Sequence, residues 1–239
     1  KNIKSFEIGS DFPSGIYAKL LSKGWKINLT QKNNFPERRI KNEDEVKKIA
    51  YSQRAAASGV NAAIKMIACS SIGEKGKLYD SYGIITSERV REFIQVELLK
   101  FGCIGRDVIV ACGDQSTDPH ERGFGPLLAH NPIILDVFPR SEKSGYWGDI
   151  TRTVCKGAAP LDLKRMFSAV FLAQKKALSH IRAGVSSDEV HQRVCESLKK
   201  SGFETGEKNG VNYGFFHGTG HGVGLDIHEA PRIGRSGEM

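Results

Sequence analysis

The sequence lacks any uninterrupted apolar run long enough to cross a bilayer, since a membrane-spanning helix needs about 20 consecutive apolar residues. It is also poor in cysteine, with five in 239 residues and none spaced as Cys-x-x-Cys. An odd number of scattered cysteines argues against a disulfide framework and against a zinc knuckle. We therefore expect reduced thiols in a cytoplasmic protein that has no membrane partner.

Blocks of like charge are missing as well. The net charge is +8, but lysine and arginine are scattered among the acids, and no run of five or six like charges occurs. A basic patch for nucleic acid or acidic lipid would concentrate that charge. A solvated basic surface is the favoured interpretation, and no nucleic-acid partner is expected. Internal repeats and low-complexity tracts are also absent from the sequence.

Helices and strands alternate in groups along the chain, which predicts an α+β fold. Four helices are expected in this order. The first begins at Glu43 and has the apolar stripe Val46, Ile49, Ala50, Ala57, Val60, Ile64 and Ile67, and the second is capped by Thr86 or Ser87 and has Val90, Phe93, Ile94 and Leu98 on one face. The third runs from Leu161 to Arg182, and the fourth from the capping box of Ser186 and Glu189 to Gly202. The expected strands are the runs "RDVIVACG", "IILDVFP" and "GYWGDITRTV".

Two regions are expected along the chain. Residues 1–34 hold too few apolar residues to bury a core of their own, and they are interpreted as the end of a preceding N-terminal domain. The polar stretch "NNFPERRIKNEDEV", residues 33–46, looks like a boundary, and residues 35–239 are expected to form the second region. The chain begins at Lys1 within mixed polar sequence, and we expect it to be a piece of a longer protein.

Two aspartates end two of the predicted strands. Asp136 and Asp149 are joined by a polar segment that contains Gly145. If the strands form a hairpin centred between Glu142 and Lys143, the two carboxylates lie directly opposite each other, with Cβ atoms about 5 Å apart. The neighbouring residues are apolar and aromatic, so burying both charges without a partner would be costly. A cation between them would remove the conflict, whereas two exposed acids flanking a loop is the simpler alternative.

Three of the seven histidines fall in the stretch "HGTGHGVGLDIHEAP", residues 217–231. Each glycine in a helix interior costs about 1 kcal/mol relative to alanine, so the stretch is expected to be extended or turned backbone. Two aspartates and a histidine suit Mn²⁺, Co²⁺ or Zn²⁺ better than soft metals. A histidine that is simply hydrogen-bonded in the core is the alternative for any one of the three.

The strings "GDITRTV" and "HGTGHGVGLDIHEAP" resemble those of the prolidase, aminopeptidase P and creatinase family, peptidase family M24. The resemblance begins near "FPERRIKNEDEVKKI" and runs to the last residue. It implies the pita-bread fold, two divalent metal ions (Mn, or else Co or Zn), a peptide substrate with proline at its second position, and a homodimer.

The resemblance also implies roles for six residues of this chain. Asp136 resembles the first aspartate ligand, Asp149 the aspartate that bridges both metals, and His221 the single histidine ligand. The other three histidines, which resemble those that line the substrate and stabilise the oxyanion, are His120 in "STDPHERG", His217 and His228. No role is expected for His130, His180 or His191.

Two features depart from the family pattern. The spacing from Asp136 to Asp149 is two residues longer than expected, and an even increment keeps both side chains on one face of a sheet. The family also has two glutamate ligands downstream of its histidine segment, which this sequence does not contain; Glu229 matches neither. We therefore expect a catalytic domain that is truncated at its C-terminus and inactive by itself.

The function expected from the resemblance is a metal-dependent exopeptidase that cleaves between an N-terminal residue and proline. One alternative is a pita-bread binding module for protein or chromatin partners, and another is a creatinase-type hydrolase of a non-peptide C–N bond. Retention of Asp136, Asp149 and His221 argues against the binding module, because a repulsive carboxylate pair has no use without a cation.

Overall fold

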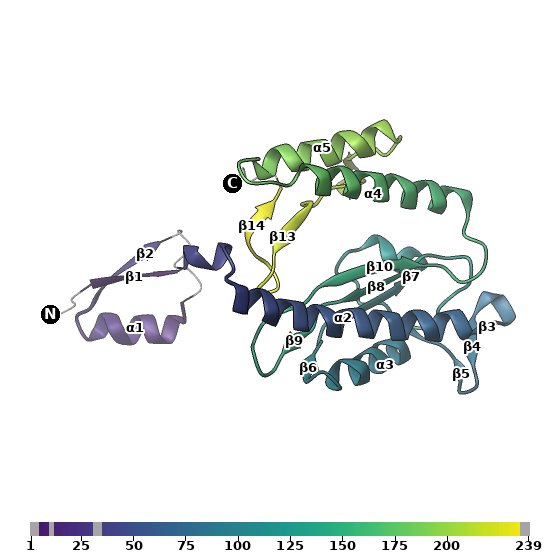
Figure 1. Cartoon of the computed structure of the whole chain (residues 1–239), viewed down its shortest axis with the longest axis horizontal. Helices are drawn as coiled ribbons and strands as arrows, with labels where there is room; N and C mark the ends of the chain where they lie inside the picture. The colour runs from purple at the N-terminus through teal and green to yellow at the C-terminus, as the bar shows by residue number, and fades with distance from the viewer. Residues whose placement is uncertain (1–4, 10–11, 31–34, 235–239) are drawn as a thin grey trace. The chain divides into compact units, whose positions relative to one another are not determined.

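A computed structural model describes residues 5–9, 12–30 and 35–234 of the chain (Figure 1). The chain divides into two compact units, Lys1–Lys41 and Asn42–Met239. The predicted boundary after residue 34 falls next to residues outside the described ranges, and it stays a prediction. Within the described residues, no helix combines the length and the apolar character needed to cross a membrane.

The first unit is a small β-α-β arrangement. Strand β1 (Ser5–Gly9) pairs in parallel with β2 (Lys26–Thr30), and helix α1 (Ser14–Ser22) connects them. The rings of Phe6 and Trp25 pack with their centroids 5.7 Å apart. A short 3-10 helix, η1 (Pro36–Arg39), follows.

The centre of the second unit is a three-stranded antiparallel sheet in the order β10, β8, β7. Its strands are β7 (Ile109–Cys112), β8 (Ile133–Val137) and β10 (Ile150–Val154). Helices α2 (Glu43–Cys69) and α3 (Ser87–Leu99) cover one face of this sheet (Figure 1). Strand β8 buries every second side chain toward these helices, so the side chains between them point to the other face.

Helix α2 buries a face of small residues, which corrects the predicted stripe. Of that stripe only Val60 and Ile67 are buried, and Val46 is 53% exposed. A Cβ added at Gly59 would lie 3.1 Å from Ile94 of α3 and 3.6 Å from Val137 of β8. The prediction was based on the spacing of the larger apolar residues, but close packing of α2 against a helix and a sheet requires small residues on the buried face.

Helix α3 begins as predicted, because the Thr86 hydroxyl accepts a hydrogen bond from the Arg89 N–H. Val90, Ile94 and Leu98 are buried, but Phe93 is 41% exposed and does not join them. The prediction for Phe93 was therefore wrong, since a helical face that includes it is wider than the contact with the sheet.

Short elements fill the loops around the sheet. They are β3 (Ser71–Ile72), η2 (Glu74–Gly76), β4 (Leu78–Asp80), β5 (Gly83–Ile84), β6 (Cys103–Ile104), η3 (Gly113–Thr117) and β9 (Arg140–Ser141). Strands β3, β4 and β5 form one small sheet, and β6 pairs with β9.

The last part of the chain pairs two helices with two hairpins. Helices α4 (Leu161–His180) and α5 (Ser187–Lys200) pack against each other on the other side of the central sheet from α2 and α3 (Figure 1). The Ser186 side chain caps α5, as predicted. Two antiparallel pairs follow, β11 (Gly206–Lys208) with β12 (Val211–Tyr213) and β13 (Gly220–Gly222) with β14 (Glu229–Ile233).

Candidate active site

The two aspartates lie on the same face of the central sheet, but they are not directly opposite each other. Asp136 pairs with Thr151, and Ile150 pairs with Val137, so Asp149 lies two residues before the partner of Asp136 and just ahead of β10. The predicted register was therefore wrong by two residues, and the shared face is confirmed because side chains alternate along a strand.

The turn of the hairpin explains this register. The Gly145 N–H donates to the Ser141 carbonyl, and the Ser141 N–H donates to the Tyr146 carbonyl. Gly145 has a φ of +77°, a conformation that L side chains rarely adopt. The centre of the turn therefore lies one residue later than predicted, and each residue of β8 pairs with a residue two positions later than predicted.

Asp136 is a half-buried carboxylate under electrostatic strain. Burial raises its pKa, and the nearby charge of Asp149 raises it further. The Thr151 hydroxyl donates to Asp136 Oδ1 at 2.6 Å, and that bond together with the charges of His221 and His228 opposes the rise. The carboxylate is therefore held in place by Thr151 and would be stabilised by any cation beside it.

His221 meets the second aspartate from the β13 strand. Its Nε2 lies 3.5 Å from Asp149 Oδ2, with both side chains about three-quarters buried. Its Nδ1 lies 3.0 Å from the Gly222 carbonyl oxygen, which can only accept, so Nδ1 carries the proton. In neutral His221 the lone pair on Nε2 then faces the carboxylate. Burial raises the pKa of Asp149, and the charge of His221 lowers it.

Two more of the predicted histidines come close to this group. The rings of His221 and His228 are 4.4 Å apart at an interplanar angle of 81°. Partial burial lowers the pKa of His228, and the charges of His221, Arg232 and His120 lower it further. His228 is therefore biased toward its neutral form, and His120 is near enough to influence it although the two are distant in sequence.

His217 has a different environment. Its Nδ1 lies 2.8 Å from the Gly218 carbonyl oxygen, and its ring packs edge-on against Phe215 at 4.7 Å and Phe216 at 6.0 Å. These contacts are with its own segment of the chain, and its substrate-facing role stays a prediction.

Asp136, Asp149 and His221 have the chemistry to bind a divalent cation, although their side chains are too far apart to hold one ion together. Across residues 5–9, 12–30 and 35–234, no three His, Cys, Asp or Glu side chains come together closely enough to hold one ion. Two carboxylates whose pKa values are raised by burial share a face, and a histidine lone pair points at one of them. Two facing acceptors need a proton or a cation between them, so Asp136, Asp149 and His221 fit a metal such as Mn²⁺, Co²⁺ or Zn²⁺.

Sequence reasoning missed two residues that organise this site. Thr151 holds Asp136, and its place could have been found from the two-residue alternation with Asp149. Trp147 joins the aspartate hairpin to the histidine segment, since its backbone N–H donates to Gly224 O at 2.8 Å and its indole Nε1 donates to Leu225 O at 3.1 Å. No sequence pattern indicates that second contact, because the two segments are far apart in the chain.

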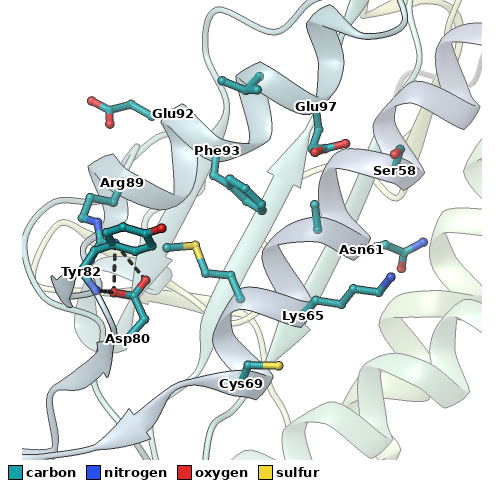
Figure 2. A pocket seen from close by; sticks show the side chains of 13 residues that line it. Ser58, Asn61, Lys65, Cys69, Asp80, Tyr82, Arg89, Glu92, Phe93 and Glu97 are labelled. Atoms are coloured by element: carbon teal, nitrogen blue, oxygen red, sulfur yellow. Dashed lines mark hydrogen bonds and ion pairs between the residues drawn. The ribbon is translucent and has the colours of Figure 1, made fainter.

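Two cavities of the described structure lie away from these residues. The larger, about 940 Å³, lies between α2 and α3 and is lined by Met66, Phe93 and Val96, with the ion pair of Asp80 and Arg89 at one end (Figure 2). A smaller one of about 460 Å³ lies along α5. None of the six candidate residues lines either of these two cavities.

Known proteins resemble this chain along its length. Residues 47–239 match metallopeptidase family M24. The Xaa-Pro dipeptidase of Pyrococcus horikoshii is 28% identical over 244 residues, which cover 100% of this chain and 62% of the relative. Uncharacterized peptidase YqhT of Bacillus subtilis is 34% identical over 127 residues, which cover 53% of this chain and 33% of the relative.

Solved structures of prolidases are similar to this chain along its whole length. The prolidase from Pyrococcus horikoshii superposes with a TM-score of 0.81 at 25% identity, over 100% of this chain and 63% of that one. The prolidase from Pyrococcus furiosus gives a TM-score of 0.80 at 23% identity, over 99% of this chain and 64% of that one. The chain spans between 33% and 62% of the length of the two curated relatives described above.

The chain therefore belongs to metallopeptidase family M24 and has the pita-bread fold of that family, as the resemblance predicted.

Proposed function

We propose that this chain carries the metal-binding half of a peptidase that hydrolyses the bond between an N-terminal residue and proline. The contact between Asp149 Oδ2 and His221 Nε2, on the sheet face that Asp136 shares, is the observation that supports it most. The proline preference rests on relatives that are named Xaa-Pro dipeptidase and prolidase. A cytoplasmic location and a homodimer belong to the same proposal.

Asp136, Asp149 and His221 would hold the metal, and Asp149 would bridge two ions. When bound, the divalent ions lower the pKa of a water molecule and polarise the scissile carbonyl. The Thr151 hydroxyl keeps Asp136 Oδ1 oriented, and the Gly222 carbonyl accepts from His221 Nδ1 and so turns Nε2 toward Asp149. Both contacts hold the ligand side chains before a metal binds, which lowers the cost of ordering them on binding.

The remaining histidines would act on the substrate. His228 is biased toward neutrality, so it has one N–H to donate to the peptide carbonyl and to the oxyanion that forms when the carbonyl is attacked. His120 and His217 would line the peptide. A charged His228 would repel the metal ions next to it, and its lowered pKa avoids this at neutral pH.

Hydrolysis of Xaa-Pro dipeptides and longer Xaa-Pro peptides tests the proposal, with Mn²⁺, Co²⁺ or Zn²⁺ added to residues 1–239 and to any longer form of the polypeptide. We expect His221→Ala to lose both bound metal and activity. We expect His228→Ala to retain the metal and to lose about 10²–10³ in rate, the usual effect of removing one oxyanion donor. His180→Ala is the matched control, because His180 contacts Glu189 on the helix surface.

Metal analysis and rates separate the alternatives. Equal loss of metal in His221→Ala and His228→Ala would contradict the division of roles. Hydrolysis of creatine without hydrolysis of peptides would support a C–N hydrolase. Peptide binding that is never followed by cleavage, in every form of the polypeptide and with each metal, would support a binding module.

A further inference from the structure

The side chain of Gln53, on α2, holds the backbone of Asp149 with two hydrogen bonds. Gln53 Oε1 accepts from the Asp149 N–H at 2.9 Å, and Gln53 Nε2 donates to the Asp149 carbonyl at 2.9 Å. Both bonds are partly buried. One side-chain amide thus satisfies the donor and the acceptor of a single residue, as a neighbouring strand would.

The hairpin register explains why Asp149 needs such a partner. The Gly148 N–H donates to the Pro139 carbonyl at 2.9 Å, so Gly148 is hydrogen-bonded toward β8. In an antiparallel pair the next residue turns its N–H and C=O the other way. Those of Asp149 therefore face the outer edge of β10, which is one of the two edge strands of this sheet in the described part of the chain. Buried backbone groups require partners, and Gln53 supplies them.

The approach of α2 to the hairpin makes this contact possible. A Cβ added at Gly148 would lie 2.4 Å from the Ser52 carbonyl carbon, so only glycine permits the helix to come this close. The fully buried Ser52 hydroxyl also donates to the Tyr146 carbonyl at 2.8 Å. Gln53 is therefore brought to Asp149 by a local close contact that involves backbone on both sides.

We propose that Gln53 is a positioning residue that sets where the Asp149 carboxylate lies relative to Asp136 and His221. The backbone fixes the direction of the Cα–Cβ bond, so a clamp on both polar groups of Asp149 sets the point from which its carboxylate reaches toward Asp136 and His221. The proposal rests on the proposed function, since it assigns Gln53 a role in preparing the metal ligands. Gln53 reaches no ligand atom and acts only through Asp149.

Gln53→Met tests this, because methionine keeps the length and volume of the side chain but has no amide. Two quantities are measured on residues 1–239: the exchange rate of the Asp149 amide proton by NMR without metal, and the affinity for Co²⁺ by its visible absorption. We expect Asp149 exchange to accelerate at least about tenfold. We expect Co²⁺ affinity to fall about 10–100-fold, the effect of losing a group that orients a ligand.

Ser52→Ala is the matched control, since it removes a buried hydrogen bond to the same hairpin without touching Asp149. It should lower the melting temperature comparably and leave Asp149 exchange and Co²⁺ affinity near wild type. Unchanged Asp149 exchange in Gln53→Met, or equal losses of Co²⁺ affinity in both variants, would overturn the role of Gln53. If residues 1–239 bind no Co²⁺, the proposed function is decided by metal binding in a longer form of the polypeptide that supplies the missing glutamates. The clamp is then decided by Asp149 exchange and by the NMR contact between Asp149 and His221, which Gln53→Met should weaken.

Discussion

The part of the chain that carries the aspartates is packed far more heavily than the part that carries the histidines. Beneath Asp136 and Asp149, the core joins α2, α3 and the central sheet, and Leu135 and Val137 of β8 are fully buried. Around the histidines, the core cluster consists of Ala169, Ala173, Ala177, Val190, Val194 and Leu198. Half of those residues are alanines, which bury little area each.

Helix α4 leaves several large apolar side chains exposed. Phe167 is 57% exposed, Val170 55%, Phe171 45% and Leu178 66%. Phe215 and Ile233, on either side of the histidine segment, pack against this smaller cluster. Polar contacts add to that packing: the two hydrogen bonds of Trp147, and the contact of His191 Nδ1 with Thr219 Oγ1 at 2.9 Å. The aspartates therefore lie above a large buried core, whereas the histidine segment lies against a smaller one.

Leucine truncation should show the largest contrast. Leu135→Ala removes a fully buried side chain directly beside Asp136, and we expect the free energy of unfolding to fall by about 3–5 kcal/mol. Leu198→Ala, at the α4–α5 contact, should cost about 2 kcal/mol, because its surroundings are smaller and can collapse around the cavity. Urea unfolding of both variants measures this, and equal losses would mean that the two parts are equally well packed.

Trp147→Phe tests the link between the two parts, with an intermediate effect. The substitution keeps an aromatic ring and removes the indole donor to Leu225 O, so we expect a loss of about 1 kcal/mol. Amide exchange should accelerate in β13 and remain unchanged in β8. Trp25→Phe is the control, since Trp25 contacts Phe6 in the first unit. Faster exchange in β8 and β13 alike would show that Trp147 supports the whole unit.

Acid titration should give the smallest effect. Burial raises the pKa of Asp80, but hydrogen bonds from the Tyr82 N–H and from Arg89, with the charge of Arg89, outweigh it and lower the pKa below 3.8. The stabilisation from Asp80 is therefore complete above that value and is lost as the pH falls through the lower folded-state pKa. Between about pH 5 and about pH 3, Asp80→Asn should lose less stability than wild type in urea unfolding.

The matched ion pair in the histidine part is exposed. Hydrogen bonds from His180 and Arg193 lower the pKa of Glu189, whose side chain is 47% exposed. As with Asp80, the lowered pKa means that the stabilisation is lost as the pH falls, but solvent and salt screen an exposed pair. Glu189→Gln should therefore change the acid-induced loss of stability less than Asp80→Asn does, and only at low salt. A larger response to Glu189→Gln than to Asp80→Asn would reverse the comparison.

Much of the fold was predictable because it depends on local patterns. Strands β7 and β8, the cap of Thr86 on α3 and the cap of Ser186 on α5 follow from short runs of apolar or capping residues. The buried face of α2 was not predictable from spacing, since which of two helical faces is buried depends on the neighbours that cover it.

The candidate site divides in the same way. The pairing of Asp136 and Asp149 on one face followed from their odd separation within a hairpin, and the exact register did not, because it depended on the turn at Gly145. The approach of His120 to His228 came from motif resemblance and not from spacing. The hydrogen bonds that Thr151, Trp147 and Gln53 donate are visible only in the folded chain.

The sequence by itself determined the family, the types of side chain available to a metal and the face of the sheet on which the aspartates lie. These depend on residue identity and on the two-residue period of a strand, which are properties of the chain alone. Only the tertiary structure decided that His221 meets Asp149, that Trp147 joins their segments and that Gln53 holds the Asp149 backbone. Those contacts join residues 72 to 96 positions apart, and their distances are set by how α2, the hairpin and β13 pack, which no local pattern encodes.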